Sequence, residues 1–236
     1  MIIGSVDIIQ KNNSVYTICN IDTYKQCSRF LLLFQSFLRI NPNINPNLSD
    51  IISNNNDEVN KNLEEFFQAG EWHYIQADIE TNIFLLKRLH DACILPNEVN
   101  MCDCGIGLGT ILYDLYLQSK EFDNKFTFTG IEKYKRYTDP LRTYLLKYWN
   151  DELNLIEDDI MNVDYSNWNF IYFYQPFKVA DKAIKFYLKV IQEVKPGTII
   201  IGLNHFQVQT YGDDNLISKF NELKCHKIDD IIVFQK

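Results

Sequence analysis

The chain has 236 residues, of which 46% are apolar, so it can bury one substantial core and carry an appendage to its main domain. Its formal net charge of −8 argues against a protein that binds extended nucleic acid through a general basic surface, although a local basic strip would survive that argument. The six cysteines follow no metal-binding or secreted-framework spacing, and no stretch resembles a membrane span or a secretory signal. We therefore expect a cytoplasmic protein that has neither a metal site nor a membrane contact.

The first 60 residues are predicted to form an N-terminal accessory segment. Two β-like runs, 2–9 and 14–18, predict a hairpin, and residues 23–40 have a helical, apolar pattern. Asparagine, proline and serine then dominate residues 41–57, which favours turns over regular structure. We interpret 1–60 as an accessory unit that covers part of the main domain, and 61–236 as that main domain.

Beyond residue 60 the chain alternates between helical and strand patterns. Apolar residues recur at steps of four, three, three and four from Ile79 to Cys93, which predicts a helix that ends before Pro96. A further helix is expected to begin at Asp139-Pro140. The remaining predicted elements are strands at 99–103, 126–132, 153–156, 170–174 and 198–203, helices at 110–119 and 181–193, and a hairpin of 223–228 with 231–235.

This alternation predicts an α/β fold: a doubly wound, mostly parallel sheet with an antiparallel C-terminal edge hairpin, in three α/β/α layers. Ligands of such sheets bind at the carboxyl ends of the strands, near the point where the strand order switches. Each of the five predicted parallel strands is followed by polar residues. These are Asp103, then Glu132, then Asp158 and Asp159, then Gln175, and finally Asn204 with His205. We expect them to share one rim of the sheet.

The most informative stretch follows the first of these strands and reads Asp103-Cys-Gly-Ile-Gly-Leu-Gly-Thr110. Its three alternate glycines form a turn without Cβ atoms, and Thr110 stands where a helix cap is expected. A ligand can lie against this bare backbone, and the first N–H groups of the helix can donate to it. Thr110 occupies the place of the third glycine in a dinucleotide-binding fingerprint, which disfavours a nicotinamide-dependent reductase.

The Asp-x-Gly-x-Gly-x-Gly pattern, with acidic residues after the next two strands, resembles the class I S-adenosylmethionine-dependent methyltransferases over about residues 70–236. The resemblance implies S-adenosyl-L-methionine as the cofactor. It implies that Asp103 and the backbone of Gly105 and Gly107 hold the amino-acid end of the cofactor, and that Glu132 accepts hydrogen bonds from both ribose hydroxyls. An ionised carboxylate suits that task because its two oxygens only accept hydrogen bonds.

The same resemblance implies further contacts with the cofactor. Gly109 completes the glycine turn, and Asp159, or Asp158 in the alternative register, meets the adenine amino group. Ile160 then lies against the adenine ring, and Tyr74 belongs to a segment that closes over the cofactor.

The residues after the fourth strand, Tyr174-Gln175-Pro176-Phe177, are similar to the Asn/Asp-Pro-Pro-Tyr/Phe motif of amino-group methyltransferases. That motif orients the attacking nitrogen through a side-chain amide or carboxylate and a backbone carbonyl. Here Gln175 replaces Asn or Asp and the second proline is absent, so either the acceptor sits further out or the role has moved. We expect methyl transfer to a nitrogen of a protein or small molecule. The alternative is a non-catalytic binding or scaffold protein that retains the fold.

Overall fold

The computed structural model describes residues 84–107, 109–142, 146, 152–229 and 231–236, together with two strands near the N-terminus. These strands, β1 (Asp7–Lys11) and β2 (Ser14–Ile18), pair antiparallel with Lys11 opposite Ser14, which confirms the predicted hairpin. The predicted helix at 23–40, the turn-rich stretch at 41–57, the boundary at residue 60 and Tyr74 lie outside the described residues.

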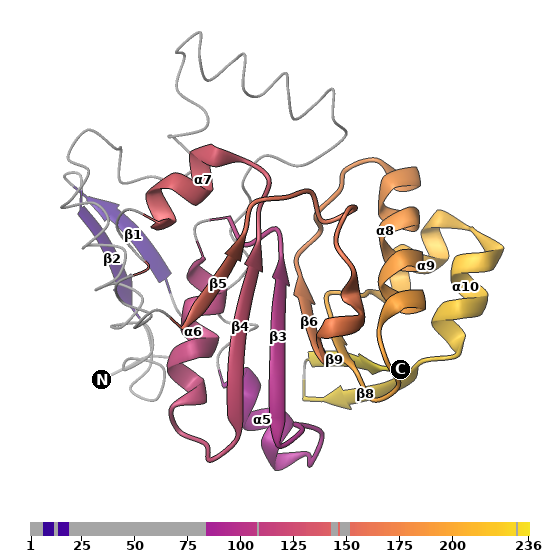
Figure 1. The fold of residues 1–236 in the computed structure, drawn as a ribbon, viewed down its shortest axis with the longest axis horizontal. Coiled ribbons are helices and arrows are strands. Elements are labelled where there is room, and N and C mark those ends of the chain that lie inside the picture. The colour runs from indigo at the N-terminus through magenta and orange to yellow at the C-terminus, as the bar shows by residue number, and fades with distance from the viewer. Residues whose placement is uncertain are drawn as a thin grey trace, which may run out of the picture.

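A seven-stranded sheet forms the centre of the main domain (Figure 1). Its strand order is β5-β4-β3-β6-β7-β9-β8, and the first five of these are parallel. The strands are β3 (Glu98–Cys104), β4 (Lys125–Ile131), β5 (Leu153–Ile156), β6 (Phe170–Phe173), β7 (Ile199–Ile201), β8 (Lys224–Ile228) and β9 (Ile231–Gln235). The last strand, β9, lies between β7 and β8 and is antiparallel to both. The predicted α/β sheet is confirmed, because β5, β4, β3, β6 and β7 run parallel and the C-terminal hairpin adds an antiparallel edge.

Helices cover both faces of the sheet, because successive residues of a strand point to opposite sides. Val99 and Met101 of β3 belong to a core shared with α5 and α6, whereas Cys102 and Cys104 belong to a second core shared with α8, α9 and α10. The helices are α5 (Leu85–Asp91), α6 (Thr110–Ser119), α7 (Lys135–Pro140), α8 (Ala180–Glu193), α9 (His205–Tyr211) and α10 (Asp214–Asn221), with a short 3₁₀ turn at Tyr165–Asn167. None of the helices in the described part of the chain has the length and apolar character needed to cross a membrane.

Three predicted helical features are wrong. The helix predicted to begin at Asp139-Pro140 begins earlier, because α7 starts at Lys135. Residues 141 and 142 stay helical, and most of the predicted helix beyond them lies outside the described residues. Cys93 is exposed in a left-handed conformation beyond the end of α5 and is not part of its apolar face. The helices α9 and α10 were not predicted, although the side chains of Asn204 and Asp213 cap them.

Candidate functional site

The order of the sheet switches between β3 and β6, because the chain continues to β4 and β5 on one side and to β7 on the other. Ligands of doubly wound sheets bind in the crevice that this switch opens beyond the carboxyl ends of the strands. Asp103 lies within the last two residues of β3, and Glu132 directly follows β4. Asp159 follows β5, and Tyr174 directly follows β6. The fold therefore brings the predicted polar residues to one edge of the sheet.

The glycine turn leaves β3 in a conformation that favours glycine. Gly105, Gly107 and Gly109 have φ angles of 86°, 54° and 75°, all in the left-handed region. The carbonyl of Ile131 accepts hydrogen bonds from the N–H groups of Gly105 and Ile106, at 2.9 and 3.0 Å, which ties the turn to β4. Gly109 is the residue that caps α6, so the expectation that Thr110 is the cap is wrong by one position. A cap with positive φ suits glycine better than β-branched threonine.

The glycines of this turn differ in what surrounds them. Among the described residues, no atom lies within 4 Å of a Cβ atom added to Gly105, so this residue borders open space. A Cβ atom on Gly109 would lie 2.8 Å from Cδ1 of Leu141, so Gly109 allows close packing of the turn against the segment after α7. Gly105 therefore faces a space that a ligand can use, and Gly109 supports the shape of the turn.

Glu132 links the glycine turn to the start of α7. Its Oε2 accepts a hydrogen bond from the backbone N–H of Gly107 at 3.2 Å, and its Oε1 accepts one from the N–H of Tyr134 at 3.0 Å. The side chain is buried, with 8% of the residue exposed. Each carboxylate oxygen has a second lone pair, so Glu132 can accept further hydrogen bonds without releasing these two.

Asp103 is a buried acid whose carboxylate has no hydrogen-bond partner among the described residues, and 5% of the residue is exposed. Burial, and then the charge of Glu132, raise its pKa to about 8. An acid of this kind gains most from a neighbouring cation, because a positive charge favours the ionised form. The arrangement fits a ligand that brings an ammonium group to the glycine turn.

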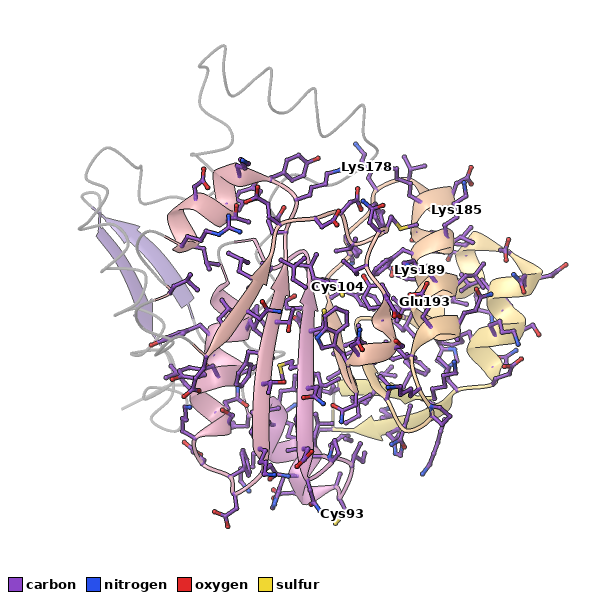
Figure 2. The ribbon with its side chains drawn as sticks, in the orientation of Figure 1. Cys93, Cys104, Lys178, Lys185, Lys189 and Glu193 are labelled. Carbon is purple, nitrogen blue, oxygen red and sulfur yellow. The ribbon has the colours of Figure 1, made fainter. Side chains whose placement is uncertain are left out.

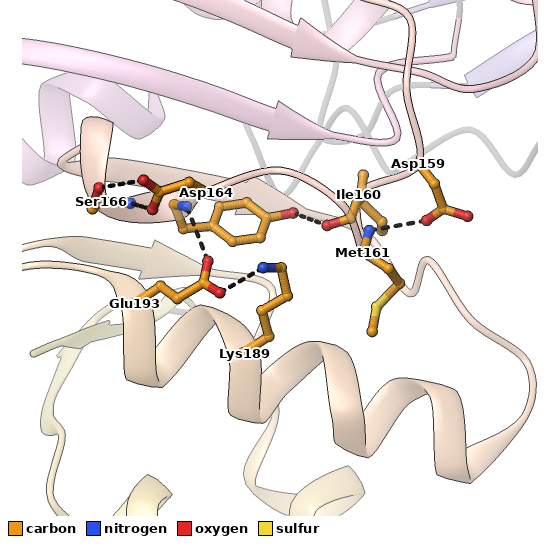
Figure 3. A network of polar contacts seen from close by, with 8 residues as sticks. Asp159, Ile160, Met161, Asp164, Ser166, Lys189 and Glu193 are labelled. Carbon is orange, nitrogen blue, oxygen red and sulfur yellow. Dashed lines mark hydrogen bonds and ion pairs between the residues drawn. The ribbon is translucent and has the colours of Figure 1, made fainter.

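The loop after β5 carries the two aspartates that compete for one predicted role, and Figure 3 shows Asp159 with its contact to Met161. Asp158 is exposed, and its Oδ1 accepts hydrogen bonds from Asp159 N at 2.7 Å and Asn162 Nδ2 at 2.8 Å, so it stabilises the turn itself. Asp159 accepts from Met161 N at 2.9 Å through Oδ1, and its Oδ2 lies 3.3 Å from Lys133 Nζ. Lys133 directly follows Glu132, so the ion pair joins the Asp159 loop to the loop after β4.

Tyr165 anchors the loop after β5 to α8 through hydrogen bonds, and no feature of the sequence predicted this role. Its hydroxyl donates a hydrogen bond of 2.8 Å to the carbonyl of Ile160, and its backbone N–H donates to Glu193 Oε2 at 3.1 Å (Figure 3). Lys189 Nζ lies 2.5 Å from Glu193 Oε1, which fixes that carboxylate on α8. A single buried tyrosine in a short 3₁₀ turn has no sequence periodicity that could reveal such a contact.

Gln175 and its neighbours lie beyond the carboxyl end of β6, at the same edge of the sheet. Gln175 is exposed, has a φ of 41°, and its amide makes no hydrogen bond with the described residues. Tyr174 is 43% exposed, whereas Phe177 is buried with its ring 5.6 Å from that of Phe186 in an edge-on contact. Strained residues at exposed sites are enriched where function requires them. Phe177 anchors the turn in the core, and Tyr174 and Gln175 reach the surface beside Pro176.

Other titratable groups do not gather here. The ring of His205 packs edge-on against Phe220 and Phe234, with centroid distances of 4.7 and 5.5 Å. Cys102 and Cys104 lie in the core with their sulfur atoms 3.9 Å apart, and burial raises the pKa of Cys102 well above its usual value. Within the described residues, no three His, Cys, Asp or Glu side chains are grouped so that they could hold a metal ion.

The solved structures that match this chain include methyltransferases. A putative class I S-adenosylmethionine-dependent methyltransferase from Listeria monocytogenes superimposes with a TM-score of 0.53 at 11% identity, over 90% of this chain and 87% of that one. The chain has the class I methyltransferase fold. A precorrin-6y C5,15-methyltransferase from Geobacter metallireducens matches with a TM-score of 0.43 at 12% identity, over 69% of this chain and 89% of that one. An RNA methyltransferase from Salinibacter ruber, in complex with S-adenosyl-L-homocysteine, matches at 0.45 and 14% identity, over 68% of this chain and 91% of that one. No protein-family model and no curated protein matches the sequence.

The methyltransferase fold places most of the predicted site residues along one edge. The charge of Glu132 acts on Asp103, and Glu132 accepts a hydrogen bond from the glycine turn. Asp159 pairs with Lys133, the residue after Glu132. Gln175 follows the neighbouring strand β6, which lies next to β3 in the sheet. The roles assigned to these residues remain predictions.

Proposed function

We propose that the protein is an S-adenosylmethionine-dependent methyltransferase whose acceptor atom is a nitrogen. The observation that supports this most is Asp103, a buried carboxyl group whose pKa is raised to about 8 by burial and by the charge of Glu132, at the start of a glycine turn that borders open space. A buried carboxylate is costly to ionise unless a cation pairs with it, so this position suits a cationic ligand group. The ammonium group of the methionine moiety is such a group.

The residues on this edge match the parts of the cofactor. Asp103 would hold the ammonium group, and the bare backbone at Gly105 would lie against the methionine moiety. Glu132 would accept hydrogen bonds from the ribose hydroxyls while it retains those from Gly107 and Tyr134. Asp159 would accept from the adenine amino group, and Ile160, which is held by Tyr165, would lie against the ring.

Gln175 would orient the acceptor. When bound, the cofactor supplies a methyl group on a positively charged sulfur, which is already an activated leaving group. The task of the protein is therefore alignment, and alignment can contribute about 7–11 kcal/mol to catalysis. The amide oxygen of Gln175 would accept a hydrogen bond from the acceptor N–H and direct the nitrogen lone pair at the methyl group. The proton that the nitrogen loses would pass to solvent at this exposed turn.

Two measurements test the proposal. Calorimetry with S-adenosyl-L-methionine and S-adenosyl-L-homocysteine is expected to show binding of both to the intact protein. Incubation of the protein with a cell extract and cofactor radiolabelled at the methyl group is expected to transfer label to a component of the extract. Cofactor binding without any transfer would favour the scaffold alternative, and absence of binding would refute the proposal as a whole.

Replacement of Gln175 separates alignment from cofactor binding. Gln175→Ala is expected to lower the turnover rate by up to about 100-fold, because misplacement of a reacting group has that effect, and to leave cofactor affinity unchanged. The control is Gln192→Ala, because Gln192 is also an exposed glutamine but lies on α8. This substitution should change neither the turnover rate nor the cofactor affinity. A loss of cofactor affinity with normal turnover in Gln175→Ala would remove this residue from the acceptor site.

A further inference from the structure

A row of lysines follows the Gln175 turn. Lys178, Lys182, Lys185 and Lys189 recur at steps of four, three and four on or just before α8. This spacing places side chains on one face of a helix. The buried residues of α8 lie on a different face; they are Ala183, Phe186, Tyr187, Val190 and Ile191. Figure 2 shows Lys178, Lys185 and Lys189 following one another along the helix from the end nearest the carboxyl edge of the sheet.

The first three of these residues form what we call the lysine strip: Lys178, Lys182 and Lys185. Lys189 is excluded because its side chain is only 19% exposed. Residues 178–189 contain a single acid, Asp181, although the chain as a whole has a net charge of −8. The lysine strip is therefore a local positive surface on an acidic protein.

The lysine strip begins at the expected acceptor position. Lys178 directly follows Phe177, and Lys182 Nζ lies 5.5 Å from the centre of the Phe177 ring. Tyr174, on the other side of Gln175-Pro176, presents a ring that is 43% exposed. Cations and an accessible aromatic face thus flank the same turn.

We propose that the lysine strip and Tyr174 bind a single-stranded nucleic acid, which is the methyl acceptor. Lysine ammonium groups bind phosphates as point charges, and an exposed aromatic ring offers a stacking surface to any base. An acidic peptide would use the cations but has no need for the exposed ring, so the pairing of the two favours nucleic acid. The acidic remainder of the surface repels a polyanion and confines it to this short strip. This inference rests on the proposed function and names its substrate class.

Binding of a fluorescein-labelled single-stranded RNA oligonucleotide, followed by fluorescence anisotropy over a series of salt concentrations, tests the role of the lysines. Each phosphate contact on a single strand contributes about 0.7 to the slope of log affinity against log salt, so the double variant Lys178→Gln/Lys185→Gln should lose about 1.4. The control is Lys224→Gln/Lys227→Gln, which removes the same charge from two exposed positions of edge strand β8. Equal losses in both double variants would mean that only net charge matters and would overturn the proposal.

The contribution of Tyr174 is tested with probes that lack bases. Tyr174→Ala should weaken RNA binding about fivefold or more, since stacking of one base is worth at least that much, and should leave binding of inorganic polyphosphate unchanged. Phe206→Ala is the aromatic control, because Phe206 is exposed on α9, which contacts the buried face of α8 through Tyr187 and Gln207. Binding of poly-glutamate as tight as that of RNA would identify an acidic polypeptide as the partner and overturn the proposal.

These measurements need no cofactor, so they separate this inference from the proposed function. Binding of S-adenosyl-L-homocysteine without any affinity for RNA at low salt would overturn the substrate class alone. Affinity for RNA that depends on the lysine strip and Tyr174, together with transfer of labelled methyl to that RNA, would support both.

Discussion

Glu132 combines a structural and a predicted ligand role in one side chain. Because it accepts hydrogen bonds from two backbone N–H groups, Glu132→Ala would leave both donors without a partner in a buried place. We expect a loss of about 1–3 kcal/mol in the free energy of unfolding and a loss of similar size in cofactor binding. Urea denaturation and calorimetry measure the two quantities. Loss of stability with an unchanged dissociation constant would remove the ribose contact and leave the structural role.

Asp103 makes stability depend on pH in an unusual direction. Its pKa in the folded protein is about 8, whereas an aspartate in an unfolded chain has its ordinary pKa of 3.8. Between these values the folded state binds more protons than the unfolded state, so the contribution of Asp103 to stability falls as pH rises and levels off above about 8. The side chain introduced by Asp103→Asn cannot ionise, so the stability of this variant should not show this decrease as pH rises.

Denaturation of both proteins at a series of pH values tests this expectation. The advantage of Asp103→Asn over the natural sequence should grow steadily from pH 4 to 8 and then become constant. Added S-adenosyl-L-homocysteine should stabilise the natural sequence more than the variant, because its ammonium group pairs with the ionised carboxylate. A stability difference that does not vary with pH would show that Asp103 has an ordinary pKa.

At the scale of elements, the loop after β5 depends on one tyrosine hydroxyl. Tyr165→Phe removes the 2.8 Å hydrogen bond to the Ile160 carbonyl and should cost about 1 kcal/mol of stability. It should also weaken cofactor binding, since Ile160 and Asp159 are then held less firmly. Tyr187→Phe loses a hydroxyl contact with Gln207 on α9 and is the matched control, with unchanged cofactor affinity. Equal cofactor affinities of Tyr165→Phe and Tyr187→Phe would argue against a positioning role for Tyr165.

The glycine turn and the segment after α7 also form one packed unit. Gly109→Ala places a Cβ atom 2.8 Å from Leu141 Cδ1 in a residue with a φ of 75°, so both crowding and backbone strain oppose it. Gly212→Ala, with a φ of 65° and no atom within 4 Å, carries only the backbone strain, which is about 1–2 kcal/mol. Thermal denaturation should therefore rank Gly109→Ala as the less stable. Equal stabilities would mean that Leu141 moves aside without cost.

At the scale of the whole molecule, the sequence predicts the sheet well because each central strand is a short buried run that ends in polar or glycine residues. The ends of β3 and β4 could be placed to within a residue for that reason. The bounds of the helix near Pro140 could not be placed so closely, because proline suits either the first turn of a helix or the position where it stops. Helices α9 and α10 each bury few residues, such as Val208, Leu216 and Phe220, so their periodicity is faint.

The candidate site could likewise be predicted only in part. Asp103, Glu132 and Asp159 could be identified because each stands at a strand end, where parallel topology gathers residues that are distant in the chain. The ion pair of Asp159 with Lys133 and the bond from Tyr165 to Ile160 could not, because both depend on the path of an irregular loop. Phe177 was expected around the acceptor, yet its contact with Phe186 places it in the core, a distinction that depends on where the chain turns after Gln175.

The position of β9 has a consequence for the order of assembly. β8 pairs only with β9 in the sheet, so it cannot join before β9 has been placed against β7. During synthesis the half of the sheet that carries the glycine turn emerges from the ribosome well before residues 231–235, and domains tend to fold in the order in which they emerge. Residues 224–228 therefore join the sheet together with β9 or after it. Until β9 docks, β7 exposes an open strand edge, and such an edge is a template for aggregation.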